Sequence, residues 1–520
     1  MDCSIKQNES IPLKNFLFSA QSAIRLGILL FSGILQGLLL TAQAQECGTG
    51  PAPASHLSYL ESLIPYYQAQ TEDTNWIRLP VTAHVVRSSS GFGGMTETAV
   101  YATICNLNER FASGRISFYL SERIRFINNT AYYGATSYGP LGTMIDQENI
   151  ARTINIYYTD LSGMGLCGFA YYPLSGPGGF QNDGAIVMSF GCSQPNGTTL
   201  AHEMGHYLSL PHTFDQTSNN PLDPNDAERV TRNFNEVAPR LSANCFTAGD
   251  RFCDTPSDFI AGRWSCPSSR TALDLNSDVM KPDSSYYMSY SNDNCMSRFS
   301  EQQMTAMRAT VNSTNAPRGY LTLNPYPNFP AITAYPAKFF PQITDTVVPN
   351  NALFRWAPIN GASLYQIKIF QFNVNVFDTL VEDTFYHALG NRLRGMRQYS
   401  WIVRGINGGN LCTPFSPRDS FSTSTYVFAG VNDALNTSKP LVYPTALAAG
   451  DLLTLEGLQA GTPILLTLRD PLGRSVWTFQ DFNEDEGRLV KVPGDLPYGH
   501  YLLTCTQAGK GYAYRILLKP

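Results

Sequence analysis

The sequence has few charged residues, few histidines and no excess of positive charge. Asp, Glu, Lys and Arg make up 15% of its 520 residues, the formal net charge is −5, and seven residues are histidine. Soluble domains typically contain roughly 25% charged residues. A nucleic-acid-binding protein needs a basic surface to neutralise phosphates, so this composition argues against that class. Plentiful glycine (41) and proline (33), with 12% aromatic residues, suit a loop-rich extracellular protein with β-domains.

Long apolar runs are also absent, apart from one near the N-terminus. The run from Leu26 to Leu40 follows the basic residues Lys14 and Arg25, and a small-x-small ending, Ala42-Gln43-Ala44, comes after it. This arrangement predicts a secretory signal peptide, residues 1–44, cut after Ala44. The alternative is a membrane anchor, but the run is shorter than the ~20 residues that span a bilayer. We therefore expect an exported chain whose mature form has no transmembrane segment and can keep disulfides.

The rest of the chain divides by pattern into four stretches. Residues 45–75 contain an amphipathic helix, and residues 76–322 mix strand and helix patterns as an α+β domain does. A Pro-rich connector at 325–330 then marks a boundary. Short alternating runs separated by turn residues follow in residues 331–425 and 436–520. They predict two all-β sandwich domains after the α+β domain.

The segment that carries chemistry holds three of the seven histidines. His202 and His206 are four residues apart, so on a helix their imidazoles lie one turn apart on the same face. His212 completes a three-histidine set if the chain turns after the helix, and Pro211 supports such a turn. Three protein ligands leave one coordination position for water, which distinguishes a catalytic zinc site from a structural one.

Glu203 adjoins the first histidine and is expected to act as the general base. Its carboxylate can approach a zinc-bound water without being a ligand, accept its proton and deliver that proton to a leaving amine. The pattern therefore predicts zinc-dependent hydrolysis. The alternatives are a helix with unconnected histidines and a zinc fold that has lost catalysis.

Residues 202–212 resemble the long zinc-binding signature of the metzincin metallopeptidases, and most closely that of the pappalysin-like group. The resemblance implies a mixed sheet with a long zinc-binding helix. The sequence departs at Ser209, where the signature has a glycine suited to positive φ. Residues 285–290 resemble the methionine-containing turn of this family, which implies that Met288 lies under the metal. By the same resemblance, Tyr290 points its hydroxyl toward the metal and stabilises the oxyanion. An ordinary aromatic-rich strand is the alternative.

The resemblance to pappalysin-like peptidases covers residues 76–322 and extends to the loop around 249–256. Asp250 and Asp254 in that loop are candidate calcium ligands, although both residues also serve as turn-formers without a metal. Cys47 resembles a pro-segment cysteine that occupies the open zinc position and keeps a zymogen latent; a structural disulfide is the alternative. Asp293 either lines the primed side and favours a basic substrate residue there, or is a solvated loop aspartate.

Connectivity of the cysteines cannot be read from sequence alone. The first candidate disulfide joins Cys266 to Cys295, because this bond would tie the segment before the methionine-containing turn to the segment after it. Two further candidates pair Cys167 with Cys192 and Cys245 with Cys253.

The two C-terminal stretches carry resemblances of their own. Residues 331–425 resemble a fibronectin type III domain in their aromatic core pattern, with Trp356 and Trp401 among its members. Residues 436–520 resemble the C-terminal sorting domain of type IX secretion in Bacteroidetes-type bacteria; another adhesive β-domain is the alternative. The sorting domain implies that the secretion machinery is a partner and that the protein is secreted or attached to the outer-membrane surface.

These inferences combine into one prediction: a secreted zinc metalloendopeptidase made as a latent zymogen, with protein or peptide substrates, zinc as cofactor and a candidate calcium site. Two alternatives remain. One is a cell-surface binding or adhesion protein with a vestigial zinc fold, and the other is a zinc amidase that acts on cell-wall peptides.

Overall fold

The computed structural model describes residues 46–69, 75–173, 175, 183–312, 316–389, 392–425, 440–459, 461–471, 473–483, 487–507 and 510–519. The expected signal peptide, residues 1–44, lies outside them. Within the described residues, no helix has the length and apolar character needed to cross a membrane. The chain forms two units, one ending at Thr425 and the other comprising the residues after it.

A seven-stranded mixed sheet forms the centre of the α+β domain. Its strands run in the order β1-β6-β7-β5-β2-β3, and β4 also pairs with β2. All pairs are parallel except β6 with β7. The strands are β1 (Glu46–Cys47), β2 (Ile77–Arg87), β3 (Ile116–Leu120), β4 (Arg125–Asn128), β5 (Ile154–Thr159), β6 (Leu166–Ala170) and β7 (Ile186–Ser189).

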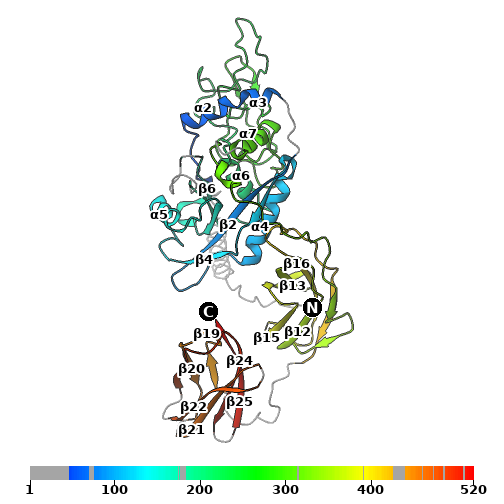
Figure 1. Cartoon of the computed structure of the whole chain (residues 1–520). Helices are drawn as coiled ribbons and strands as arrows, with labels where there is room; N and C mark the ends of the chain where they lie inside the picture. Colours follow the sequence, from blue (N-terminus) through cyan, green and yellow to red (C-terminus); the bar gives the residue numbers. More distant parts are fainter. Residues whose placement is uncertain are drawn as a thin grey trace, which may run out of the picture. The chain divides into compact units, whose positions relative to one another are not determined.

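Helices cover both faces of this sheet (Figure 1). Because successive strand side chains point to opposite faces, Ile156 and Tyr158 of β5 join the core with α4 and α6, while Tyr157 joins the core with α5. The helices are α2 (Ala54–Ser62), α3 (Ile64–Ala69), α4 (Glu97–Phe111), α5 (Tyr138–Glu148), α6 (Thr199–Tyr207) and α7 (Glu301–Val311), with 3-10 turns η1 (Ala112–Gly114), η2 (Ser162–Met164) and η3 (Gly319–Thr322).

Local signals explain where these helices begin. The Thr96 hydroxyl accepts a bond from the Ala99 N–H at the start of α4, and Ser300 and Gln303 form a capping box at the start of α7. The predicted histidine-bearing helix is α6, which has nine residues and is therefore shorter than expected. The segment between α6 and α7 contains only two short strands, β8 (Ala272–Leu273) and β9 (Val279–Met280).

The first β-sandwich follows the α+β domain within the same unit. Its sheets have the orders β10-β12-β15 and β11-β17-β16-β13-β14. Trp356 and Trp401 are buried in its core, as the aromatic pattern predicts. The strands are β10 (Lys338–Phe340), β11 (Thr346–Val347), β12 (Asn351–Trp356), β13 (Leu364–Gln371), β14 (Val374–Val381), β15 (Phe385–Leu389), β16 (Gln398–Ile406) and β17 (Asp419–Thr423).

The second sandwich repeats the topology of the first. Its sheets have the orders β18-β20-β23 and β19-β25-β24-β21-β22, so each strand corresponds to the one eight places earlier. In both sandwiches the outer pair of the larger sheet, β11 with β17 and β19 with β25, is parallel. The strands are β18 (Leu441–Tyr443), β19 (Ala446–Ala448), β20 (Leu452–Glu456), β21 (Thr462–Arg469), β22 (Ser475–Asn483), β23 (Gly487–Lys491), β24 (Gly499–Gln507) and β25 (Lys510–Lys519).

Candidate metal centre and active site

Three histidine side chains meet at the end of α6. His202 and His206 extend from successive turns of this helix, and His212 comes from the segment after it. The Nε2 atom of His206 lies 3.1 Å from Nε2 of His202 and 3.1 Å from Nε2 of His212. All three side chains are buried. The spacing of four residues thus places the imidazoles as the helical pattern predicts.

The second ring nitrogens show which atoms are available to a metal. Nδ1 of His202 lies 2.6 Å from the Tyr287 carbonyl oxygen, and Nδ1 of His206 lies 2.7 Å from the Leu210 carbonyl oxygen. A carbonyl only accepts, so each Nδ1 carries the proton and each Nε2 presents a lone pair. Burial lowers the pKa of His202 to about 4 and lowers the pKa of His206 and His212 well below the usual value.

This donor set fits a tetrahedral cation. Converging lone pairs repel one another unless a positive ion lies between them, and neutral imidazole is a preferred zinc ligand. Zn–N bonds of 2.0–2.1 Å in a tetrahedron place the nitrogens about 3.3 Å apart. The observed 3.1 Å between Nε2 atoms is close to that spacing.

Ser209 turns the chain between the helix and His212. Its φ is +91°, a left-handed conformation that glycine adopts more readily than serine. Two contacts hold the residue there. Its hydroxyl bonds the Thr310 hydroxyl at 2.7 Å, and its carbonyl oxygen lies 2.9 Å from Nε2 of His56. The Ser209 side chain is fully buried. Serine thus stands where the signature has glycine and adds a hydrogen bond that glycine cannot make.

Glu203 is fully buried beside the histidines. Its Oε2 accepts a hydrogen bond from the Thr49 hydroxyl at 3.2 Å and a longer one from the Cys47 thiol at 3.5 Å. Its Oε1 has no hydrogen-bond partner among the described residues. Burial raises the pKa of Glu203 to about 8, and the two hydrogen bonds oppose that rise. A carboxyl group with such a pKa can both accept and return a proton near neutral pH.

The methionine-containing turn lies directly beneath α6. Met288 is fully buried, and a Cβ on Gly205 would come within 2.4 Å of its sulfur, so the helix needs glycine at that close approach. The Met288 carbonyl accepts a bond from the Thr213 N–H, one residue after His212. The Tyr290 ring centroid lies 4.8 Å from that of His212, and its hydroxyl donates to the Cys47 carbonyl at 3.3 Å.

Cys47 enters this centre on an added edge strand. Strand β1 pairs in parallel with β6, and the Gly48 N–H continues the pairing by donating to Gly168. The Cys47 sulfur belongs to a four-residue donor group with His202, His206 and His212, in which all ligand atoms lie within 4.8 Å of one another. Burial and then the neighbouring Glu203 raise the pKa of the thiol well above its usual value.

Sequence reasoning missed Thr49. Its hydroxyl lies 3.2 Å from both Glu203 Oε2 and the Ala170 carbonyl oxygen, so one proton is shared between these two acceptors, and the same oxygen accepts from the Ala170 N–H at 2.9 Å. The signal that could have found this residue is its position two residues after Cys47.

Residues 52–61 hold the N-terminal segment against the histidine turn, the turn at Ser209 that links α6 to His212. The Ala52 N–H donates to Asp215 at 3.0 Å, His56 contacts the Ser209 carbonyl, and Glu61 forms an ion pair with Arg251 at 3.1 Å. The segment therefore contacts both sides of the site, through β6 and through the loops after α6.

Comparison with known proteins identifies this arrangement. Residues 146–312, which include the three histidines and the methionine-containing turn, match the family model Peptidase_M43, described as pregnancy-associated plasma protein-A. Residues 146–312 of the α+β domain thus match the pappalysin family of metalloendopeptidases, and we refer to the α+β domain as the pappalysin domain. An "Extracellular metalloprotease" of Colletotrichum graminicola is 27% identical over 310 residues, which cover 54% of this chain and 96% of that protein. One of Arthroderma gypseum is 25% identical over 282 residues, covering 51% and 84%.

Among solved structures, the chain is similar to mature mirolysin of Tannerella forsythia in complex with a cleaved peptide. The identity is 19%, the TM-score is 0.36, and the match covers 48% of this chain and 97% of mirolysin. The chicken CNTN1 FN1-FN3 domains match 36% of this chain at 11% identity with a TM-score of 0.15, covering 66% of that chain.

A pocket opens beside the metal-binding side of the pappalysin domain. Its lining includes His202, Glu203 and Tyr290 together with Arg263 and Asp293. Asp293 Oδ1 accepts bonds from Arg263 at 2.7 Å and from the Thr198 hydroxyl at 3.0 Å. The aspartate considered for the substrate side is thus in the pocket, but it is paired with an arginine that sequence reasoning did not single out.

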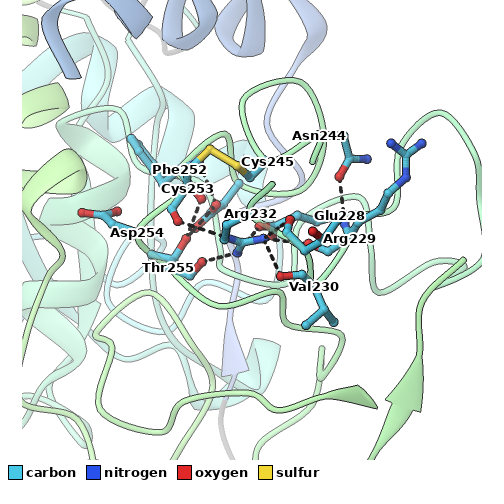
Figure 2. A network of polar contacts seen from close by, with 12 residues as sticks. Glu228, Arg229, Val230, Arg232, Asn244, Cys245, Phe252, Cys253, Asp254 and Thr255 are labelled. Carbon is cyan, nitrogen blue, oxygen red and sulfur yellow. Dashed lines mark hydrogen bonds and ion pairs between the residues drawn. A yellow bond between two sulfur atoms is a disulfide. The ribbon is translucent and has the colours of Figure 1, made fainter. Parts of the chain in front are cut away.

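The pappalysin domain places Asp250 and Asp254 in a separate polar network. Asp250 accepts bonds from the Phe252 N–H and the Thr255 hydroxyl, and Asp254 accepts from the Gln302 N–H. Figure 2 shows how Arg232 reaches from Glu228 to the carbonyls of this loop. Among the described residues, these two aspartates do not form a three-residue donor group.

Four disulfides join described residues of the first unit. Cys266–Cys295, Cys167–Cys192 and Cys245–Cys253 are the candidate pairs of the sequence analysis. A fourth, Cys105–Cys412, joins α4 of the pappalysin domain to the first sandwich. Cys47 and Cys505 are free.

Proposed function

We propose that this chain is an extracellular zinc-dependent endopeptidase that is made as a latent zymogen. The observation that carries the proposal is the convergence of three buried Nε2 atoms, 3.1 Å apart, beside the Glu203 carboxylate. His202, His206 and His212 would hold the zinc ion. The printed name "Extracellular metalloprotease" of the relatives supports both the location and the class of reaction.

The three histidines would hold a zinc ion that, when bound, would lower the pKa of water toward about 7 and polarise the substrate carbonyl. Glu203 accepts the proton of the attacking water through its unengaged Oε1 and then delivers it to the leaving amine. The Tyr290 hydroxyl donates a hydrogen bond to the oxygen of the scissile carbonyl as that oxygen gains negative charge. Met288 packs under Gly205 and keeps the histidine-bearing helix in position.

Replacing Glu203 with alanine tests this assignment. Glu203→Ala removes the proton acceptor but none of the three histidines, so we expect cleavage of denatured casein to fall by at least about 100-fold while zinc content stays near one ion per chain. If wild type has no chelator-sensitive activity on any protein, a binding or adhesion protein with a vestigial zinc fold is the better account. Activity on purified peptidoglycan but not on casein would favour the amidase.

Latency would come from the N-terminal segment. The Cys47 sulfur lies in the donor group of the three histidines, and β1 occupies the edge of β6 beside Glu203. A thiolate in the open coordination position would exclude water from the zinc ion. Residues 45–75 would then act as a pro-segment that must leave before a substrate can enter.

The proposed precursor has a signal peptide (1–44), a pro-segment (45–75), the peptidase domain (76–322), the fibronectin type III-like sandwich (331–425) and a C-terminal sorting domain (436–520). The sorting domain would engage a type IX secretion machinery and deliver the enzyme outside the cell or onto the outer-membrane surface. Protein or peptide substrates are the expected partners.

Calcium is a second proposed ligand, at the network of Asp250 and Asp254. Glu228 lies next to this network. A Cβ placed on Gly249, the residue before Asp250, would lie 2.6 Å from Glu228 Oε2. That oxygen is buried and has no partner among the described residues. Burial also raises the pKa of Asp250 to about 8, so a hard cation would stabilise both carboxylates. Millimolar calcium should raise the melting temperature of wild type but not of Glu228→Gln; equal shifts would exclude this site.

A further inference from the structure

We infer that Arg318 is a positioning residue for His206, which it holds in place by joining the end of α6 to the two strands beside it. This inference rests on the proposed zinc peptidase function and adds a residue to its machinery. Arg318 follows α7 in the chain, and its side chain is 0% exposed. A buried guanidinium is costly unless its charge and its donors are matched, so its contacts show what it holds together.

The guanidinium donates to backbone carbonyls from three different parts of the domain. Nε donates to Tyr207 at 2.7 Å, Nη1 to Asp183 at 2.6 Å and Nη2 to Tyr171 at 2.9 Å. Tyr207 is the last residue of α6, Tyr171 directly follows β6, and Asp183 lies three residues before β7. Arginine suits this position because its five N–H donors lie in a fixed plane, whereas lysine has a single ammonium group.

The contact with Tyr207 completes the end of the histidine-bearing helix. The carbonyls of residues 204–206 accept bonds from the backbone N–H groups of residues 208–210, and the Tyr207 carbonyl accepts from Arg318. A cation at the C-terminal end of a helix also complements the helix dipole. The guanidinium carbon lies 3.4 Å from the centroid of the Tyr207 ring. Arg318 thus holds both the backbone and the ring of the residue that directly follows His206.

The contact with Tyr171 reaches His206 by a second route. The next residue, Tyr172, has its hydroxyl oxygen 3.4 Å from Nδ1 of His206, and the two ring centroids are 5.5 Å apart. The same Nδ1 donates to the Leu210 carbonyl. Contacts at the nitrogen that does not bind the metal fix the orientation of a ligating imidazole. By holding the Tyr171 carbonyl, Arg318 keeps Tyr172 against the ring of His206.

Two further contacts match the charge and the remaining donors of Arg318. Asp183 Oδ2 lies 3.5 Å from Nη1, and the side chain of this aspartate is 5% exposed. The Tyr320 hydroxyl accepts from Nη1 at 2.9 Å. None of these partners is a proposed zinc ligand. Arg318 therefore acts on the metal centre only through Tyr207 and Tyr172.

Zinc affinity tests this role directly. Arg318→Met keeps the apolar stem of the side chain but has no donor, so His206 loses both supports. We expect the zinc dissociation constant of the full chain, measured by competition with a chromophoric chelator, to rise at least about 10-fold. The visible absorption of the cobalt-loaded chain, which reports the coordination geometry, should also change. Arg318→Lys keeps the charge but lacks the planar donor set, so it should recover only part of the affinity.

Arg308→Met is the matched control. Arg308 also donates to three backbone carbonyls, those of Gly114, Arg115 and Asn75, but none of them belongs to α6 or adjoins β6 or β7. This variant should have a lower melting temperature but the zinc affinity and cobalt spectrum of wild type. A purely structural role would make Arg318→Met behave in the same way.

The inference is overturned if folded Arg318→Met binds zinc less than about 10-fold more weakly than wild type, or if Arg308→Met weakens zinc binding equally. If Arg318→Met does not fold, as judged by circular dichroism, Arg318→Lys decides, and a zinc affinity equal to that of wild type overturns the inference. In both cases a wild type that binds one zinc ion leaves the proposed function intact. A wild type that binds no zinc overturns both.

Discussion

At the scale of single residues, Ser209 illustrates how the metal centre depends on backbone conformation. The histidine turn needs φ near +91° at this position so that His212 can return to the two histidines of α6. Glycine would adopt that conformation at lower cost, but only serine offers a hydroxyl to Thr310. The strain and the hydrogen bond have opposite effects on stability and similar sizes, about 1 kcal/mol each.

Two substitutions at Ser209 separate these contributions. Ser209→Ala keeps the strain and loses the hydrogen bond, so the free energy of unfolding should fall by about 1 kcal/mol. Ser209→Gly loses the bond but relieves the strain, and we expect it to be more stable than Ser209→Ala by about 1 kcal/mol. Denaturant unfolding of both variants measures the difference. An alanine variant as stable as the glycine variant would contradict the left-handed conformation.

At the scale of elements, the proposed pro-segment combines a strand and a helix that contact the same site. Strand β1 adds to the sheet edge beside Glu203, while α2 contacts the histidine turn through His56. The strand brings Cys47 to the donor group, and the helix and its flanking residues anchor the strand. Both would have to separate from the domain during activation.

Replacing Cys47 tests the latency step. Cys47→Ala would remove the thiol proposed to occupy the open zinc position, so the unprocessed chain should convert to the mature enzyme at least about 10-fold faster when zinc is added. Cys505→Ala is the matched control, because Cys505 is the other free cysteine among the described residues and lies in the C-terminal unit. The measurement is the time course of peptide cleavage. Equal lag times for both variants and wild type would refute the role of Cys47.

How far these elements are predictable depends on the distance between the residues involved. The pairing of His202 with His206 follows from helical periodicity within one turn, and the buried Trp356 and Trp401 follow from strand alternation. By contrast, the contact of Thr49 with Glu203 joins residues 154 positions apart, and the ion pair of Arg263 with Asp293 joins loops without periodicity. No local pattern encodes such contacts, so only the folded chain reveals them.

At the scale of the whole molecule, two features lie beyond sequence patterns. The two sandwiches share one strand order, although no repeat is evident in the sequence. In addition, Cys105–Cys412 closes a loop with a sequence separation of 307 residues and joins the peptidase domain to the first sandwich. The Leu120 N–H also donates to the Gly408 carbonyl between the same two domains. A disulfide and a backbone hydrogen bond therefore join the first sandwich to the peptidase domain, so the sandwich is more than a flexible spacer.

Removing this disulfide should uncouple the two domains. The loop-closure model assigns roughly 6 kcal/mol to a loop of this length, although strain commonly reduces the measured value. We expect the double variant Cys105→Ser, Cys412→Ser to have a lower melting temperature and to show a separate unfolding transition for the first sandwich by calorimetry. An unchanged single transition would mean that non-covalent contacts alone couple the domains.

The most direct test of the central claim is anomalous diffraction at the zinc edge from crystals of the zinc-loaded mature enzyme. The account predicts one strong peak, about 2.1 Å from Nε2 of each of His202, His206 and His212, with the Glu203 carboxylate adjacent but not coordinated. A structure without that peak, or with His212 outside coordinating distance, would contradict the proposed catalytic zinc site.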